Sequence, residues 1–244
     1  MAENLFVKYR NKLKNIILGD KFYLHKDVPL SKTIAHDRWQ DYLINLANKN
    51  HWRVLEIGSR EVTGISSMRK RMSNAEYVGF DFYPGNNVDV VGDVHKLSNY
   101  FNGEKFDLIF TSACFEHFAM PWIASQEIVK LLKVGGYIFV ETHYSYSSHE
   151  RPWHYFQFSE NALEVLFNKE MGIECIEKGV SNPIVARFSK YSVKYLRGHK
   201  ITGLYCHSEF LGKKYKDVPD FNWYNVNLDA IYNGTKYVKP DSTR

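Results

Sequence analysis

Short apolar runs recur through the middle of the chain, and each of them ends at or just before an acidic or a small residue. They lie at residues 53–57, 77–81, 88–93, 106–112 and 137–140. Each run is too short for a buried helix and has the length of a buried strand. Stretches with helical spacing of apolar residues separate several of the runs. This alternation predicts an α/β fold with a mainly parallel sheet.

Helical spacing and capping residues predict the elements that cover this sheet. The expected helices lie near residues 5–18, after a cap at Ser31, over 65–72, from Pro121 to a stop at Gly135-Gly136, and after a cap at Ser159. The expected buried faces are Trp39, Tyr42, Leu43 and Leu46 in the second helix and Trp122, Ile128, Leu131 and Leu132 in the fourth. Towards the C-terminus we expect strands at 173–176 and 201–206, with a helix after Tyr191.

The length of 244 residues suits one α/β domain with additions, or at most two small domains. Hydrophobic residues make up 44%, which allows a sizeable core and argues against global disorder. We expect an N-terminal helical cap over residues 1–50, a core over 51–210 and a C-terminal extension over 211–244 packed on the core.

The charge is mild and limits the kinds of partner. The net charge of +5 is spread along the chain, which is compatible with an anionic small substrate and does not indicate nucleic-acid binding. Cys114, Cys175 and Cys206 form no Cys-x-x-Cys pair, which favours a reduced, cytoplasmic location over a disulfide framework. No window approaches the roughly 18 apolar residues of a membrane span.

The candidate chemistry gathers around residues 53–64, which read Arg-Val-Leu-Glu-Ile-Gly-Ser-Arg-Glu-Val-Thr-Gly. Gly58 lets the backbone turn sharply beside a ligand, and Glu56 can accept hydrogen bonds from hydroxyl groups or an ammonium. Asp81 follows Glu56 by 25 residues, close to the separation at which α/β nucleotide sites place the acid for the ribose hydroxyls. A carboxylate can bind both hydroxyls of a cis-diol. The pattern therefore indicates a nucleotide-type site, with a plain surface acid as the alternative for Asp81.

Residues 142–158 differ from the rest of the chain. They contain His143, His149, His154 and several aromatic residues in a segment without periodicity. Such a segment after a strand is more typical of a binding loop than of a spacer. Glu116 and His117 follow the run at 106–112 and are expected in the same crevice at the carboxyl ends of the strands.

Over roughly residues 50–180 the chain resembles the class I S-adenosylmethionine-dependent methyltransferases. The resemblance rests on an ordered set of short pieces: Glu56-Ile57-Gly58, Asp81, Asp93-Val94, the run at 106–112, and Leu131-Leu132-Lys133-Val134-Gly135-Gly136. No single piece is specific, but the ordered set is. It implies a three-layer, Rossmann-like α/β sandwich with a seven-stranded, mostly parallel sheet whose last strand is antiparallel, flanked by N-terminal helical and C-terminal additions.

S-adenosylmethionine is the cofactor that this resemblance implies. Glu56, Gly58 and Ser59 would hold its methionine end, Asp81 its ribose, and Asp93 with Val94 its adenine. The other residues expected in this site are Arg60, Phe82, Thr111 and Ser112. The family often has glycine at the positions of Arg60 and Val62, so we expect a wider loop here, with Arg60 facing the cofactor carboxylate or the substrate.

Methyl transfer to a hydroxyl needs a base with a pKa near the working pH, which points to histidine. The candidate bases are His143, His154, His117 and His149, each with a plain hydrogen-bonded loop histidine as the alternative. The residues expected to line the acceptor pocket are Glu116, Tyr144, Tyr146 and Trp153, although aromatic residues often serve packing alone. We expect no metal, because the spacings of these histidines and Glu116 match no zinc pattern.

Pro121-Trp122 and the His-Tyr-Phe-Gln-Phe-Ser segment are similar to methyltransferases of surface-polysaccharide clusters. This similarity favours a small-molecule or sugar-like hydroxyl acceptor in glycan biosynthesis. Nitrogen or carbon acceptors and a non-catalytic cofactor-binding protein remain alternatives. A nicotinamide-dependent oxidoreductase is disfavoured, because no Gly-x-Gly-x-x-Gly follows the first strand.

Overall fold

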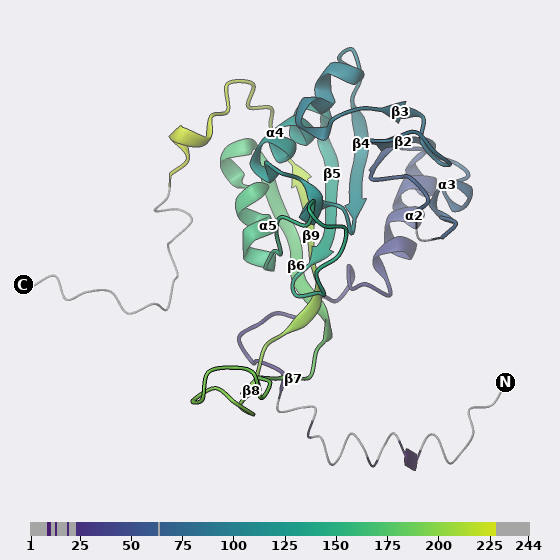
Figure 1. Ribbon diagram of the computed structural model, residues 1–244. Helices are drawn as coiled ribbons and strands as arrows, with labels where there is room; N and C mark the ends of the chain where they lie inside the picture. The colour runs from purple at the N-terminus through teal and green to yellow at the C-terminus, as the bar shows by residue number, and fades with distance from the viewer. Residues whose placement is uncertain (1–8, 11–12, 14–18, 20–22, 63, 228–244) are drawn as a thin grey trace, which may run out of the picture.

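The computed structural model describes residues 9–10, 13, 19, 23–62 and 64–227 (Figure 1). Most of the helix expected near residues 5–18 and the last part of the C-terminal extension, 228–244, lie outside the described residues, and the described residues 9–10 and 13 of that helix are helical. Among the helices of the described part, none has the length and apolar character needed to cross a bilayer.

A seven-stranded sheet forms the centre of the fold. Its strands are β1 (Arg53–Ile57), β2 (Glu76–Asp81), β3 (Val90–Val91), β4 (Phe106–Ser112), β5 (Leu132–His143), β6 (Ile173–Pro183) and β9 (Tyr205–Lys214). They follow the order β3-β2-β1-β4-β5-β9-β6, in which β9 runs antiparallel to β5 and β6 and the other pairs are parallel. The seven-stranded, mostly parallel sheet expected from the sequence is confirmed.

Helices cover both faces of the sheet and complete a three-layer sandwich (Figure 1). The helices are α4 (Pro121–Leu131) and α5 (Glu160–Leu166) on one face, and α2 (Trp39–Asn50) and α3 (Met68–Arg71) on the other. Short 3₁₀ helices lie at η2 (Val94–Tyr100), η3 (Phe115–His117), η4 (Lys169–Met171) and η5 (Trp223–Asn225).

The core lies in two layers because strand side chains alternate between the faces of the sheet. Ile109 and Ile138 pack in the cluster on the α4 and α5 side. Their chain neighbours Phe110 and Phe139 pack in the opposite cluster, where the Trp39 ring lies 4.9 Å from that of Phe139. Burial on both faces explains why these strands read as continuous apolar runs in the sequence.

The start of α2 is a correction to the sequence prediction. The helix begins at Trp39 and Ser31 does not cap it. Instead, the backbone N–H of Ser31 donates to the carbonyl of Val180 at 3.0 Å, and its hydroxyl donates to Glu209 at 2.7 Å. These contacts hold Ser31 against β6 and β9. The buried face of α2 consists of Trp39, Leu43, Ile44 and Ala47, with Tyr42 and Leu46 only half-buried.

Two more helix predictions were partly wrong. The helix expected over 65–72 is the single turn α3. The helix that begins at Pro121, as predicted, ends at Leu131, and Gly135-Gly136 fall inside β5. Trp122 is 41% exposed rather than buried, and its carbonyl accepts a hydrogen bond from the indole of Trp223 at 3.1 Å.

The strand predictions fail mainly near the C-terminus. β3 has two residues where 88–93 was expected, and no helix occurs in the described segment 191–204. The last strand of the main sheet is β9 at Tyr205–Lys214 rather than 201–206. Most of it was missed because Ser208, Glu209 and Lys214 are polar, although the fold buries them. β9 also crosses residue 210, and the division of the chain into cap, core and extension stays a prediction.

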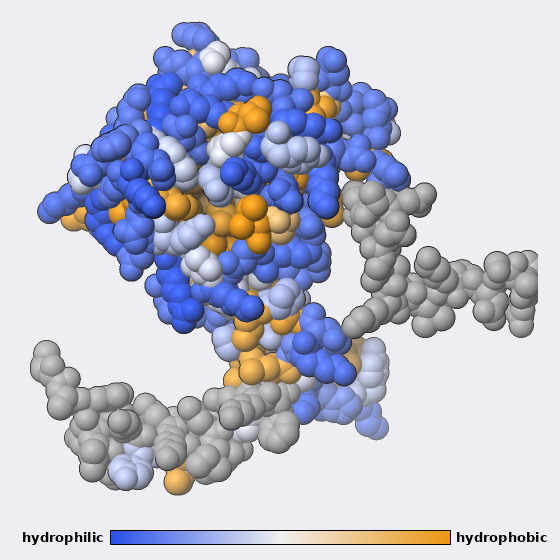
Figure 2. Space-filling model, turned by 180° about the vertical axis from the view of Figure 1, so that it is seen from behind, coloured by the Kyte–Doolittle hydropathy of each residue, from blue (hydrophilic) through white to orange (hydrophobic). Residues whose placement is uncertain are grey.

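Residues 184–204 leave the sandwich between β6 and β9 as an arm with its own small sheet. This sheet pairs β7 (Ala186–Arg187) with β8 (Lys200–Ile201) (Figure 1). Seen from behind, the surface is largely hydrophilic, and apolar residues gather in its middle and where the arm joins the body (Figure 2). The arm therefore grows from the edge of the sheet rather than forming part of its core.

Candidate functional site

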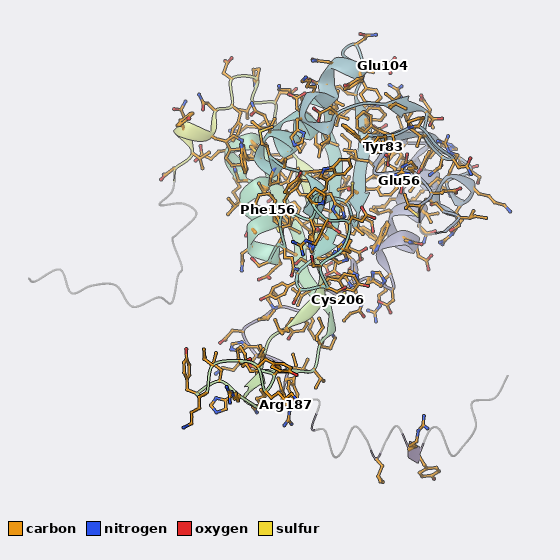
Figure 3. The ribbon with its side chains drawn as sticks, viewed as in Figure 1. Glu56, Tyr83, Glu104, Phe156, Arg187 and Cys206 are labelled. Carbon is orange, nitrogen blue, oxygen red and sulfur yellow. The ribbon has the colours of Figure 1, made fainter. Side chains whose placement is uncertain are left out.

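The predicted site residues meet at the carboxyl ends of the central strands. Ile57 of β1 is in register with Phe80 of β2 and with Thr111 of β4, and Thr111 is in register with Val140 of β5. The turns that follow these four strands therefore open on one edge of the sheet, where Glu56 and Tyr83 are labelled in Figure 3. Open α/β sheets bind their ligands at this edge.

The turn after β1 depends on glycine at position 58. Gly58 has a φ of +82°, and an added Cβ would lie 2.6 Å from the Sγ of Cys114. The backbone N–H groups of Gly58 and Ser59 both donate to the carbonyl of Phe80, at 2.9 and 3.1 Å. The turn is therefore tied to β2 and pressed against the segment after β4, as the sequence pattern predicted for a close backbone approach.

Glu56 lies one residue before the end of β1 and is poorly solvated. Burial raises the pKa of its carboxyl to about 8, although the Nδ2 of Asn87, at 3.5 Å, partly offsets this rise. The same Nδ2 lies 3.0 Å from the Ser59 carbonyl and from the Tyr77 hydroxyl. A positively charged ligand group beside Glu56 would restore the charged form of this carboxyl.

Asp81 receives hydrogen bonds from the turn after β1. The backbone N–H and the Nε of Arg60 donate to its carboxylate at 3.2 and 3.4 Å, and the N–H of Tyr83 donates at 3.0 Å. The guanidinium of Arg60 also lies 5.5 Å from the ring centre of Tyr83. Arg60 therefore closes the loop onto Asp81, the residue predicted to bind the ribose diol.

Asp93 has a structural contact besides its predicted role. It caps η2 by accepting the N–H of His95 at 2.9 Å, and its Oδ1 lies 2.7 Å from the Nδ1 of His95. Burial would raise the pKa of Asp93, but the bonds to His95 outweigh that effect and lower it. Val94 is buried, whereas Phe82 is 57% exposed and its ring lies 6.3 Å from that of Trp153. Trp153 therefore lies beside the cofactor residues rather than beside the histidines alone.

Two buried hydroxyl groups at this edge have no hydrogen-bond partner among the described residues. They belong to Ser59 and Thr111, which are 3% and 0% exposed. Buried polar groups without a partner are uncommon, so each is available to a ligand.

Sequence reasoning missed a second polar network beside β5. Ser112 donates to Glu141 at 2.8 Å, and the Nδ1 of His36 lies 2.8 Å from the other oxygen of Glu141. This bond raises the pKa of His36, whose ring stacks on that of His207 at 4.1 Å. The acid directly after the run at 137–140 was the available signal for Glu141. His36 and His207 come from distant segments and gave none.

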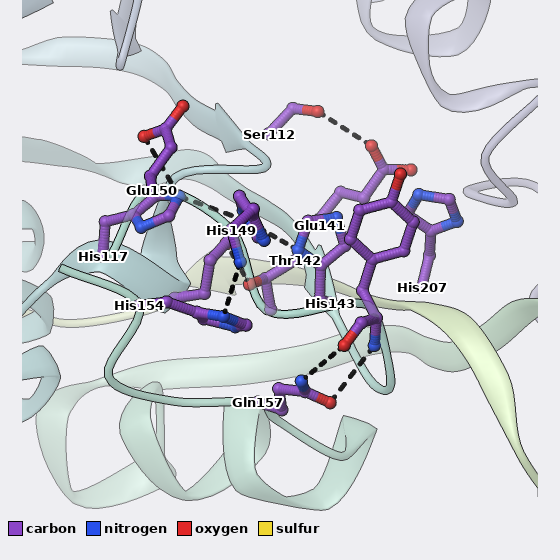
Figure 4. A network of polar contacts seen from close by, with 12 residues as sticks. Ser112, His117, Glu141, Thr142, His143, His149, Glu150, His154, Gln157 and His207 are labelled. Carbon is purple, nitrogen blue, oxygen red and sulfur yellow. Dashed lines mark hydrogen bonds and ion pairs between the residues drawn. The ribbon is translucent and has the colours of Figure 1, made fainter. Parts of the chain in front are cut away.

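The four predicted base candidates lie close to one another (Figure 4), and three of them, His117, His143 and His149, lie near the buried carboxylate of Glu116. We call His117, His143, His149 and His154 the histidine cluster. The His149 ring lies 5.0, 5.2 and 4.5 Å from the rings of His117, His143 and His154. The Nδ1 of His143 lies 2.8 Å from the Oε1 of Glu116, at the end of β5.

The carboxylate at the centre of the cluster is kept charged. Burial would raise the pKa of Glu116, but contacts with His143 and with the hydroxyl of Thr142, 2.6 Å away, hold it below its ordinary value. Burial and the neighbouring His149 and His117 lower the pKa of His154. A buried carboxylate surrounded by imidazole groups can hold a cation or accept a proton.

The predicted acceptor residues divide between two places. Tyr146 stacks on His143 with 4.4 Å between the ring centres and borders the histidine cluster. The Tyr144 ring instead lies edge-on to that of Tyr205, with 6.2 Å between the ring centres, on the side of the arm. A cavity of about 370 Å³ beside α4 is lined by Lys105 and Lys214 at the opposite ends of the strands, so it belongs to neither place.

Comparisons with known proteins agree with this architecture. A sequence profile for the family described as methyltransferase domain matches residues 32–170, more than half of the chain. No curated protein matches. A putative methyltransferase from Bacillus halodurans C-125 has a TM-score of 0.51 and 14% identity, over 72% of this chain and 99% of that chain.

Two further solved structures share the fold. A SAM-dependent methyltransferase from Archaeoglobus fulgidus has a TM-score of 0.50 and 14% identity, over 75% of this chain and 97% of that chain. The plantazolicin methyltransferase BamL, solved with a triazolic desmethylPZN analog and SAH, has a TM-score of 0.50 and 18% identity, over 73% and 84% of the two chains. On the profile match and this sheet order, the chain belongs to the methyltransferase domain family.

Proposed function

We propose that the chain is an S-adenosylmethionine-dependent methyltransferase that methylates a hydroxyl group of a small-molecule or sugar-like acceptor. The observation that carries the proposal is the buried carboxylate of Glu116 with the histidine cluster around it, at the same sheet edge as the Gly58 turn. Such a cluster is suited to taking a proton, which methylation of a hydroxyl requires.

The cofactor is S-adenosylmethionine, held by the turns after β1 and β2. Glu56 receives its ammonium, which accounts for a buried carboxyl with a raised pKa beside an open turn. Asp81 receives the ribose diol, and Arg60 moves from its contact with Asp81 to make room. Asp93 and Val94 adjoin the adenine, and the unpaired hydroxyls of Ser59 and Thr111, with Ser112 and Phe82, complete the site.

The reaction is an in-line displacement. The acceptor oxygen forms a bond to the methyl carbon, the carbon–sulfur bond breaks, and sulfur keeps the electron pair as S-adenosylhomocysteine. The proton of the hydroxyl passes to the histidine cluster. Because the methyl group is already activated by the sulfonium, alignment of the three atoms supplies much of the rate.

Aromatic rings beside the cluster support a sugar-like acceptor. Trp153 and Tyr146 are 46% and 50% exposed, and their rings contact Phe82 and His143 respectively. Exposed rings of this kind offer apolar faces to the C–H faces of a sugar ring. Together with the similarity of the segment after β5, they favour an acceptor from cell-surface glycan biosynthesis.

Binding tests the cofactor first. Calorimetric titration should show binding of S-adenosylmethionine and S-adenosylhomocysteine and none of NAD. Asp81→Ala should abolish binding, because the diol loses its charged acceptor. Asp220→Ala, at an exposed position, should bind as the parent chain does. Unchanged binding by Asp81→Ala would contradict the placement of the cofactor.

Transfer tests the reaction. The chain is incubated with labelled cofactor and with nucleotide-sugars, phosphorylated sugars and polysaccharide fragments, and the methylated atom is mapped. Glu116→Gln should lower the rate on an oxygen acceptor by roughly 10²–10⁴-fold, the range of general-base catalysis, with little change in cofactor affinity. Cofactor binding without transfer to any of these acceptors would favour the non-catalytic alternative, and a methylated nitrogen would exclude the hydroxyl acceptor.

A further inference from the structure

We propose that Glu116, His143 and His149 form a binding site for a divalent transition-metal ion of the zinc type. One ligand atom from each of these residues lies within 4.8 Å of the others. The three residues come from η3, from the end of β5 and from the loop that follows it. The expectation of a metal-free site rested on the sequence spacing of these residues, which matches no zinc pattern. The fold nevertheless brings the three side chains together.

Unsatisfied buried atoms point into this site. Glu116 is 0% and His143 is 7% exposed, and neither the Oε1 of Glu116 nor the Nδ1 of His143 makes a hydrogen bond of acceptable geometry. Nevertheless, these two atoms lie only 2.8 Å apart. Buried polar atoms without a well-aligned partner are uncommon. An ion bound by both atoms would satisfy them.

The neighbours of the ligands hold them in the form that a metal needs. The Oε2 of Glu116 accepts the hydroxyl of Thr142 at 2.6 Å, which leaves Oε1 for the ion. The Nδ1 of His149 lies 2.9 Å from the carbonyl of Ser147 and must carry the proton, so its other nitrogen keeps the lone pair. Ligand histidines in metalloproteins have such a carbonyl partner as a rule.

The donor set indicates which ion is bound. Two imidazoles and one carboxylate suit zinc and similar ions, whereas magnesium and calcium prefer oxygen ligands alone. Zinc–ligand distances of about 2.0–2.2 Å require the His149 ring to move towards Glu116 and His143 by on the order of 1 Å. His149 can do so because it lies on a surface loop and is only partly buried.

Three protein ligands leave a position open for the acceptor oxygen, as in catalytic zinc sites. This role rests on the proposed methyl transfer. A bound ion lowers the pKa of a coordinated hydroxyl. The proton would then pass to the Nε2 of His117, whose ring is held in place by its Nδ1, 2.9 Å from the carbonyl of Trp153. That Nε2 faces Glu116 and Glu150 at 3.9 and 3.7 Å.

Metal binding is measured directly on the full, tag-free chain after treatment with a chelator. Titration with zinc should show one ion bound per chain. Titration with cobalt should give the visible absorption bands of a four-coordinate site. His143→Ala and His149→Ala should each weaken zinc binding by more than about 10-fold, and Thr142→Val by about 10-fold or more. His199→Ala, which removes an exposed histidine of the arm, should leave zinc binding unchanged.

His149 is the decisive position, because its partly exposed loop side chain is not needed for the core. Zinc binding that survives His149→Ala and His143→Ala, or no zinc binding by the folded parent chain, would overturn the proposal. Cofactor binding and methyl transfer, measured on the same samples, separate the two claims. Methyl transfer by a chain that binds no zinc refutes the metal site alone. Zinc binding without methyl transfer to any acceptor supports the metal site, while the proposed function fails.

Discussion

Glu56 reduces the stability of the fold, and replacement by glutamine isolates that effect. Its carboxyl lies near the end of β1, and burial raises its pKa from the ordinary 4.5 to about 8. Glu56→Gln keeps the shape of the side chain and removes the titrating group. We expect the variant to be more stable than the parent chain above neutral pH and to bind S-adenosylmethionine more weakly.

The magnitude follows from the two pKa values. The folded chain keeps the Glu56 proton up to about pH 8, whereas the unfolded chain loses it near pH 4.5. Glu56 therefore lowers the free energy of unfolding progressively as the pH rises between these values. At about 1.36 kcal/mol for each pKa unit, the ceiling is about 5 kcal/mol. Because the side chain is partly exposed, we expect a gain of about 2 kcal/mol above pH 8 and almost none near pH 4.

Urea denaturation followed by circular dichroism, at about pH 4.5 and about pH 8.5, measures this gain. Glu174→Gln, at an exposed position of β6, is the matched control and should change stability equally little at both pH values. A Glu56→Gln variant that gains the same stability at both pH values, or is less stable at pH 8.5, would refute burial as the cause. Calorimetry on the same samples checks the loss of cofactor affinity.

Three further substitutions test the fold around the site by thermal and urea denaturation. Gly58→Ala should lower the free energy of unfolding by about 2–4 kcal/mol, because the new Cβ combines a positive φ with a contact to Cys114. Gly103→Ala, at a similar φ with open space around it, should lower it by only about 1 kcal/mol. Equal losses would contradict the close approach at Gly58. Lys214→Met should cost about 2 kcal/mol, since the buried ammonium donates to two backbone carbonyls at the end of α4, and a neutral result would mean that water replaces it. Ser159→Ala should cost about 1 kcal/mol, because the hydroxyl caps α5, and no loss would show the cap to be dispensable.

The sequence predicted the part of the fold in which local pattern and burial agree. β1 and β4 are buried on both faces and β2 is buried at Gly79 and Phe80, so their apolar runs were visible, and the Gly58 turn followed from backbone geometry. β9 was largely missed because polar residues such as Glu209 are buried in it through contacts with distant segments. The hydroxyls of Ser31 and Ser181 that bind Glu209 come from two other parts of the chain.

The site divides in the same way. Glu56 and Asp81 lie at or next to the carboxyl ends of β1 and β2, so the position of each was implied by its own strand. The meeting of Glu116 with His143 and His149 depends instead on how the loop after β5 folds back, for which the sequence has no periodic signal. A spacing rule along the chain does not detect this group, because its three side chains come from separate segments that only the fold brings together.

The position of β9 has a consequence for the synthesis of the protein. Of the strands in the part of the chain that the structure describes, β9 is the last to leave the ribosome, but it lies between β5 and β6. Until residue 214 has emerged, each of those strands has a backbone edge without its partner, and such edges pair readily with other chains. Nascent chains are therefore most prone to aggregate late in translation, and a chain that stops before residue 205 keeps both edges open.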